Sequence, residues 1–201
     1  MIMKTVNVRF MKTSAARGKE EYLFSVLPED RVEKARKYVR ENDRLLSLCA
    51  GYLVYRFVGE YAVDAYGKPR SDRLFFSLSH SGDLVGLAVC EDREVGLDIE
   101  KRDGERDEDA LAAFCFGDDE LEKYGRDGDF LSLFTSKESL SKAEGRGLDD
   151  VKAIPALPLD GAVRYNGKTY YRHALEVSGY SVSVALRDDD FAIGTKEIEV
   201  I

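Results

Sequence analysis

Apolar and polar residues alternate along several short stretches in the first half of the chain. The alternation covers residues 5–10, 74–78, 84–90 and 94–100, and a period of two is typical of β-strands that bury one face. Between the first two stretches, residues 29–57 carry apolar side chains at helical spacing, which predicts a long helical stretch that is open to a break. The first half therefore combines predicted strands with a predicted helical layer.

The second half shows a similar order of patterns. Helical patterns cover residues 109–114, 118–124 and 130–144, and strand patterns take up most of the remainder. The predicted strands are residues 163–165, 169–177, 180–186 and 191–200. Over the whole chain the pattern predicts the α+β class, with the charged, glycine-containing residues 101–109 as the crossover between halves.

One stretch of the first half is echoed in the second. Residues 81–92 and 178–189 share the pattern S-G-x-x-V-x-[LV]-A-[LV]-x-[DE]-D, at an offset of 97 positions in a chain of 201 residues. Alternating strands before tight turns can imitate each other, so the echo alone is a weak sign of duplication.

Composition narrows the class of protein. A chain of 201 residues with 44% hydrophobic residues can bury one substantial core or two small ones. No apolar run has membrane-spanning length, and residues 1–14 lack the apolar stretch of a signal peptide. Cys49, Cys90 and Cys115 have no metal-ligand spacing, so we expect buried, reduced thiols in a cytoplasmic protein. The net charge of −8 disfavours a general nucleic-acid binder and requires any anion site to be locally basic.

Two acids stand out within the strand predicted at residues 94–100. Asp98 and Glu100 are two positions apart, so both carboxylates point from the same strand face. Side by side they repel each other unless a proton or cation lies between them, and oxygen ligands suit Mg²⁺. In a chain that is 34% charged, a solvated strand face is the competing interpretation.

A third acid lies on the helix predicted at residues 130–144. On a helical wheel its apolar residues fill one arc and its Ser and Thr residues fill the opposite face. Glu138 falls within the apolar arc, and Lys142 lies one turn further on at the margin. A carboxylate on the buried side of a helix needs a partner or a metal. Lys137 falls within the same arc, so an ordinary lysine–carboxylate ion pair remains an alternative.

Four blocks of sequence between residues 67 and 148 extend these two motifs. They are GKP at 67–69, FSLSHSG at 76–82, GLDIE at 96–100 and FTSKESLSKAEGRGL at 134–148. Together, and in this order, they resemble the signatures of the 4′-phosphopantetheinyl transferase superfamily. The chain length resembles that of the longer, Sfp-like branch. Phe134 replaces the family's usual Trp, and Ser77 replaces its usual Asn with a shorter polar group.

The resemblance implies an architecture and a reaction. The longer members resemble two fused modules, which implies two similar α+β subdomains related by a pseudo-two-fold axis, here residues 1–102 and 103–201. The family transfers the phosphopantetheine arm of coenzyme A to a serine of an apo acyl or peptidyl carrier protein and releases 3′,5′-ADP. We expect a monomer, because one chain supplies both halves, with no nucleic-acid or membrane partner.

The resemblance also assigns residues. It implies that Asp98, Glu100 and Glu138 hold Mg²⁺, with Mn²⁺ as an alternative, and that Glu138 or another of these acids accepts the serine proton. Lys142 would contact the phosphates and assist the leaving group, and His80 would act beside it on the cofactor phosphates. The remaining cofactor-binding residues implied are Arg44, Lys68 and Ser79, with Lys34 and Arg36 as weaker candidates.

Alternatives remain at three points. The same acids suit a metal-dependent phosphodiesterase, and a non-catalytic module that binds coenzyme A or a carrier would share the scaffold. His173 is expected to be structural. The aromatic pair Phe114 and Phe116 belongs to the core or to a surface against which the carrier docks, and we expect a mixture of the two, with the helix that follows partly exposed.

Overall fold

The first half of the chain folds as strands around a helical layer. The computed structural model describes residues 4–63, 69–103, 106–127, 129–145, 151–156, 162–188 and 191–200. The helices of this half are α1 (Glu20–Val26), α2 (Glu29–Arg36) and α3 (Glu41–Phe57). Its strands are β1 (Lys4–Lys12), β2 (Ala62–Val63), β3 (Pro69–Arg70), β4 (Phe75–Ser81) and β5 (Leu84–Cys90). The helical stretch predicted at residues 29–57 is confirmed, with its break between α2 and α3.

The second half follows the predicted order of elements. Its helices are α4 (Glu108–Cys115), α5 (Asp118–Asp127) and α6 (Phe130–Glu144). The last strand of the first half is β6 (Val95–Lys101), and the strands of the second half are β7 (Ala162–Tyr165), β8 (Lys168–Val177), β9 (Tyr180–Arg187) and β10 (Phe191–Glu197). The side chain of Asp129 accepts the backbone N–H of Ser132 and so caps the start of α6.

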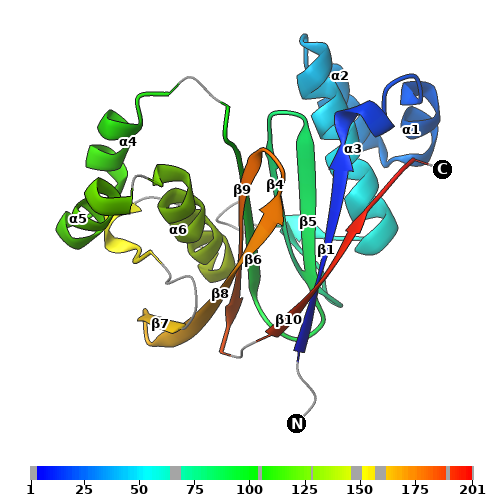
Figure 1. Cartoon of the computed structure of the whole chain (residues 1–201). Helices are drawn as coiled ribbons and strands as arrows, with labels where there is room; N and C mark the ends of the chain where they lie inside the picture. Colours follow the sequence, from blue (N-terminus) through cyan, green and yellow to red (C-terminus); the bar gives the residue numbers. More distant parts are fainter. Residues whose placement is uncertain are drawn as a thin grey trace.

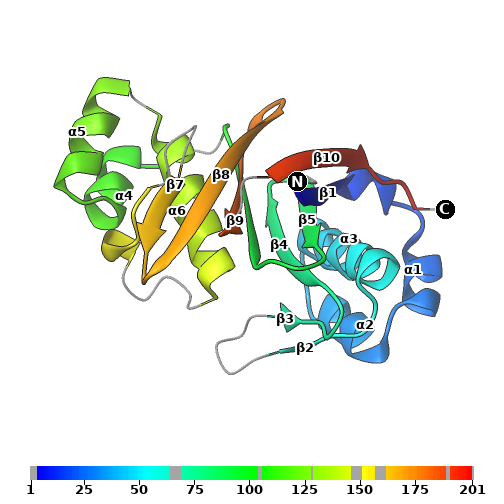
Figure 2. The same ribbon diagram turned by 90° about the horizontal axis from the view of Figure 1, so that it is seen from below.

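The described strands form two four-stranded sheets and one small two-stranded pair. The orders are β10-β1-β5-β4 and β6-β9-β8-β7, and β2 pairs with β3. All pairings are antiparallel except β1 with β10, which is parallel. Helices α1 to α3 gather on the side of the first sheet, and α4 to α6 on the side of the second (Figure 1). The view from below shows the two groups as separate lobes (Figure 2). The predicted α+β class is confirmed.

The two echoed stretches occupy corresponding strands. β5 is the second strand of a hairpin with β4 and also pairs with β1, and β9 is the second strand of a hairpin with β8 and also pairs with β6. Each hairpin turns through a glycine with positive φ, 61° at Gly82 and 80° at Gly179, a conformation that favours glycine. The strand order therefore agrees with two related halves, while the pseudo-two-fold axis itself stays a prediction.

Two apolar clusters form much of the core. One lies between α3 and the first sheet and contains Leu45, Leu48 and Leu53, all fully buried. The other joins the two sheets and contains Val8 of β1, Leu97 of β6 and Val184 of β9. Full burial of one such side chain stabilises a fold by about 1.5–3 kcal/mol. The second cluster therefore ties β6 to both sheets.

The cysteines and the helix lengths bear on two expectations from composition. Cys49, Cys90 and Cys115 are buried thiols, as predicted. Burial raises the pKa of the Cys49 thiol to about 12, which keeps it protonated. Among the helices of the described residues, none is both long enough and apolar enough to cross a bilayer.

Candidate functional site

Strand β6 and helix α6 bring the two acidic motifs into contact. A side-chain carbon added to Gly96 would lie 1.9 Å from the carbonyl oxygen of Ser139, so only glycine lets α6 approach the strand this closely. Asp98 and Glu100 follow at alternate positions and share this face of β6. The glycine of the first motif therefore positions the helix of the second motif beside both acids.

A row of serine hydroxyls connects β6 to its neighbour β4. The two strands run beside each other but belong to different sheets. Ser77, Ser79 and Ser81 of β4 accept the backbone N–H groups of Leu97, Ile99 and Lys101 at 3.0, 3.2 and 3.1 Å. We call these three residues the serine ladder. It satisfies backbone donors of β6 that no neighbouring strand accepts on this side.

Asp98 lies at the centre of the site. The residue is 3% exposed, and its Oδ1 accepts hydrogen bonds from Ser79 Oγ at 3.0 Å and from Lys142 Nζ at 2.6 Å. Lys142 also donates to Ser79 Oγ at 3.1 Å. Oδ2 is buried and has no hydrogen-bond partner within the described residues. An orphaned buried carboxylate oxygen is costly unless a cation or a further donor binds there.

Glu100 repeats this arrangement one rung further along. Its Oε2 accepts a hydrogen bond from Ser81 Oγ at 3.1 Å and lies 3.7 Å from Arg106 Nη1. Burial raises the pKa of Glu100 and the charge of Asp98 raises it further, against opposing effects of Ser81, Arg106 and Lys142. Each acid thus binds one serine and one basic side chain through a single oxygen.

Glu138 faces the same site from α6. Burial raises its pKa to about 7, the charges of Asp98 and Glu100 raise it as well, and Lys142 lowers it. The side chain is half-buried rather than enclosed in an apolar arc. Within the described residues it has no ion pair or hydrogen bond, so it is the least constrained of the three acids.

The surroundings of α6 differ from the helical wheel in two respects. Thr135, Ser136 and Ser139, on the face opposite the apolar arc, are fully buried, because this face packs on β9 and its hydroxyls meet serines there. Lys137 is also fully buried, and its ion pair is with Glu120 of α5 rather than with Glu138. A period of 3.6 residues identifies a helix face but does not reveal that a polar face is covered by polar partners.

A small pocket lies next to the acids on the other side of β4. Its volume is about 270 Å³, and Leu78 and His80 of β4 line it together with residues of α2 and α3. Arg31 Nε and Ser47 Oγ are buried there without a hydrogen-bond partner in the described part of the chain. Lys34 adds a second basic group. Asp43 also lines the pocket, so two basic side chains face one acid there, and the excess of positive charge can accept an anion.

His80 stands between this pocket and the acids. Alternate positions of β4 point to opposite sides, so Ser79 and Ser81 face β6 while Leu78 and His80 line the pocket. The pKa of His80 is lowered, first because neighbouring protein atoms partly remove the ring from water and then by the positive charges of Lys142 and Lys34. One strand thus contributes to both the acidic cluster and the basic pocket.

The remaining predicted site residues fall in different places. Arg44 is half-buried on α3, where Asp43 and Ser47 of the same helix line the pocket and Arg44 does not. Arg36 lies over the ring of Phe24. Gly67 and Lys68 of the GKP block lie outside the described residues. His173 packs its ring against Phe191 at 4.6 Å, in agreement with the structural role expected for it.

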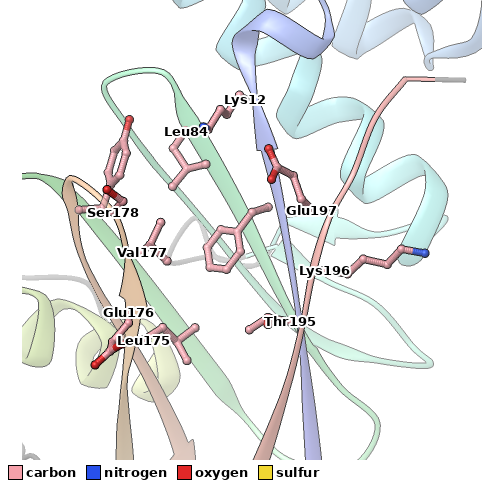
Figure 3. Close-up of a pocket in the computed structure, with 11 residues that line it drawn as sticks. Lys12, Leu84, Leu175, Glu176, Val177, Ser178, Thr195, Lys196 and Glu197 are labelled. Carbon is pink, nitrogen blue, oxygen red and sulfur yellow. The ribbon is translucent and has the colours of Figure 1, made fainter.

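A second groove, of about 530 Å³, lies between the β8–β9 hairpin and strands β1 and β10 (Figure 3). Phe10 and Leu84 line it, and both belong to the cluster that contains Leu97 and Ile99. Because Asp98 alternates with these two residues on β6, the groove opens on the opposite side of the strand from the acids. It is not part of the candidate site.

The acids of the site can hold a divalent cation only together with other ligands. No group of three or more His, Cys, Asp and Glu side chains within the described residues is arranged to hold a metal ion by itself. Mg²⁺ commonly takes only one or two protein carboxylates and completes its shell with water and substrate phosphates. The orphaned Oδ2 of Asp98 beside Glu100 fits such a partial site.

The aromatic pair before α5 divides between core and surface. Phe116 is fully buried, with its ring tilted at 38° to that of Phe130, and Phe114 on α4 is 70% exposed. Leu111, one turn earlier, is 40% exposed. The expected mixture of core and surface is confirmed, and α4, with its exposed Phe114, lies in the lobe that carries α6 (Figure 1).

Sequence reasoning missed three contributors to the site. Arg31 has a detectable signal, since it lies three residues before Lys34 on one helix face. The serine ladder is visible as three serines with a period of two, although nothing in the sequence shows that β6 is their partner. Arg106 has no signal, because it lies in the crossover and reaches Glu100 only through the fold.

Comparisons with known proteins agree with the geometry. Residues 94–195 match the family model described as the 4′-phosphopantetheinyl transferase superfamily. The match covers just over half of the chain and includes β6, α6 and the β8–β9 hairpin. A search of the curated proteins found no match.

Proposed function

The chain belongs to the 4′-phosphopantetheinyl transferase superfamily, and on this premise we propose that it moves the phosphopantetheine arm of coenzyme A to a serine of an apo carrier protein. Membership implies a transferase. The donor, the metal and the acceptor are our proposals. The observation that carries them is the contact of Asp98 with Lys142 and Ser79, which joins the two signature motifs and β4 beside a basic pocket.

We assign the basic pocket to the phosphates of the nucleotide end of coenzyme A. Arg31 Nε and Ser47 Oγ are buried donors without partners, and an anionic oxygen would satisfy them. Lys34 and His80 add donors at the same pocket. Arg44 and Lys68 would also bind the cofactor, as the resemblance implies.

The pyrophosphate would extend from this pocket past His80 to Lys142. Lys142 pairs with Asp98 at 2.6 Å and its side chain is 30% exposed, so it can exchange part of its contact for a phosphate oxygen. Ser79 holds Lys142 and Asp98 together, and its hydroxyl is fully occupied by protein groups. Its contribution to cofactor binding would therefore act through these two neighbours.

Asp98 and Glu100, with Glu138 from the helix, would hold Mg²⁺ or Mn²⁺. When bound, the metal neutralises the pyrophosphate and orients it for in-line displacement. The orphaned Asp98 oxygen supports this assignment.

The chemical step forms one bond and breaks one. The carrier serine oxygen attacks the phosphorus that bears the pantetheine arm, and the bond from that phosphorus to the leaving 3′,5′-ADP oxygen breaks. Glu138 accepts the serine proton, because it is the acid without a fixed partner. Lys142 stabilises the charge that develops on the leaving phosphate.

The carrier would dock on the lobe of α4 to α6, where Phe114 and Leu111 are exposed. One chain contains both the basic pocket and the acids, which supports a monomer with two related subdomains, residues 1–102 and 103–201, in the longer branch of the family. The three buried cysteine thiols support a reducing compartment such as the cytoplasm.

Intact mass of apo carrier proteins tests the proposal. A panel of acyl and peptidyl carriers is incubated with the protein, coenzyme A and Mg²⁺. We expect at least one carrier to gain the mass of a phosphopantetheine arm, and the gain to disappear on chelation. Cleavage of coenzyme A without a carrier would favour a phosphodiesterase. Coenzyme A binding without either reaction would favour a non-catalytic module.

A further inference from the structure

The contacts of Asp98 and Glu100 repeat a single arrangement along β6. Ser79 and Lys142 both contact Oδ1 of Asp98, and Ser81 and Arg106 both contact Oε2 of Glu100. In each case one carboxylate oxygen is fixed toward β4 and a basic side chain. The second oxygen of Asp98 is left without a partner. The repetition indicates that the serines control which oxygen of each acid is available.

We propose that Ser81 is a positioning residue that orients Glu100 for a divalent cation. Its hydroxyl accepts the N–H of Lys101 at 3.1 Å and donates to Glu100 Oε2 at 3.1 Å. The acceptor bond fixes the oxygen of the hydroxyl and directs its proton to the carboxylate. Glu100 then keeps Oε2 toward Ser81 and Arg106 and turns Oε1 to the cation. This inference rests on the proposed function for the presence of a cation.

The serine ladder supplies its own control. Ser77 accepts the N–H of Leu97 at 3.0 Å, as Ser81 accepts that of Lys101. Glu100 is the residue before Lys101 on β6. The residue before Leu97 is Gly96, which has no side chain that Ser77 could orient. Loss of the Ser77 hydroxyl therefore removes one rung of the ladder without affecting a carboxylate.

The experiment is a Mn²⁺ titration followed by electron paramagnetic resonance, with coenzyme A present and no carrier. It compares the wild type with Ser77→Ala, Ser81→Ala, Ser81→Thr and Ser81→Val. Groups that orient metal ligands typically change metal affinity by about 10–100-fold when removed. We expect a loss of this size for Ser81→Ala and Ser81→Val. Ser81→Thr keeps the hydroxyl and should bind Mn²⁺ like the wild type, as should Ser77→Ala.

Thermal unfolding of the same variants separates positioning from stability. Ser77→Ala and Ser81→Ala each remove one acceptor of a backbone N–H, so we expect similar decreases in Tm. The Ser81→Thr and Ser81→Val pair differs in little but the hydroxyl, so it gives the answer even if Ser81→Ala does not fold.

Three results would overturn the inference: unchanged Mn²⁺ affinity in Ser81→Val, an equal loss in Ser77→Ala, or no Mn²⁺ binding by the wild type. Failure of the proposed function gives a different result. A wild type that binds Mn²⁺ in a Ser81-dependent manner but modifies no carrier would contradict the transfer reaction and leave the role of Ser81 standing.

Discussion

Helices α3 and α6 occupy corresponding places in the two halves but pack in different ways. α3 lies against β1 and β5, and α6 against β6 and β9. The buried face of α3 is apolar and includes Leu45, Leu48 and Leu53. The face of α6 that meets β9 is hydroxylated, with Thr135 bonded to Ser181 at 3.2 Å and Ser139 bonded to Ser183 at 2.9 Å.

The difference separates stability from chemistry. The apolar packing of α3 stabilises the fold but does not hold charged side chains in position. On α6 the short hydroxyl contacts, together with Gly96, bring the helix close enough for Lys142 to reach Asp98. A polar helix face is affordable only because its hydroxyls have partners. The second half thus exchanges some apolar packing for a site in which charged groups are held at fixed distances.

Removing the charge of Asp98 is expected to have the largest effect. Asp98→Asn keeps the shape of the side chain but loses the carboxylate beside Glu100. Because metal stabilisation of the transition state amounts to several kcal/mol, we expect transfer to fall on the order of 10³-fold or more. The rate of mass gain by a carrier measures this. Glu197→Gln, an exposed acid on β10, is the control and should be fully active. Near-normal turnover in Asp98→Asn would contradict the site.

The packing difference itself predicts unequal losses of stability from α3 and α6. Leu48 is fully buried among apolar side chains, so Leu48→Ala should lower the free energy of unfolding by about 3 kcal/mol. Ser139→Ala should lower it by about 1 kcal/mol, since Ser183 keeps its bond from Arg172 Nε. Urea denaturation gives both values. Equal losses would show that the two helices contribute alike.

Replacement of Lys142 on α6 should lower the turnover rate more than the affinity for coenzyme A. Lys142→Met is expected to lower kcat on the order of 10²-fold, the range of one electrostatic or acid–base group. Coenzyme A affinity should change little, because Arg31, Lys34 and His80 remain. Kinetics and calorimetry on the same variant measure both. Arg56→Met on the exposed side of α3 should change neither, and an equal change in affinity and kcat would assign Lys142 to ground-state binding.

The smallest effect is expected where the two hairpin turns meet. Tyr180 donates a hydrogen bond to Asp83, and these residues are 97 positions apart, as the echoed stretches are. The bond lowers the pKa of Asp83 below its ordinary value of 3.8. Burial and the same bond raise the pKa of Tyr180 from 10 to about 12.

The pH dependence of this contact follows from the two directions. A lowered acid pKa contributes stability above pH 3.8 that is lost as pH falls through the folded value. A raised tyrosine pKa contributes stability below pH 10 that is lost as pH rises toward 12. Tyr180→Phe should therefore be destabilised by under about 1 kcal/mol between these limits and match the wild type outside them. A pH-independent difference in unfolding free energy would contradict the link between this hydrogen bond and the ionisation of Asp83 and Tyr180.

The local elements were predictable where one periodicity dominates. The strand at residues 84–90 agrees with β5, and the helix at residues 130–144 agrees with α6. Helix α1 was missed, because only Leu23 of its seven residues is buried and a single apolar position gives no period. The pair β2 and β3 was missed because each has two residues.

The site was predictable in its residue types more than in its contacts. The sequence alone determined that Asp98 and Glu100 share a strand face, that Glu138 and Lys142 share a helix, and that a glycine precedes the acids, since these follow from periods of two and 3.6 residues. Only the tertiary structure decided that Ser79 and Ser81 hold these acids, that Lys137 pairs with Glu120, and that Arg31 reaches the pocket of His80. These contacts join residues 17 to 49 positions apart, and such pairings depend on how strands and helices pack rather than on any local period.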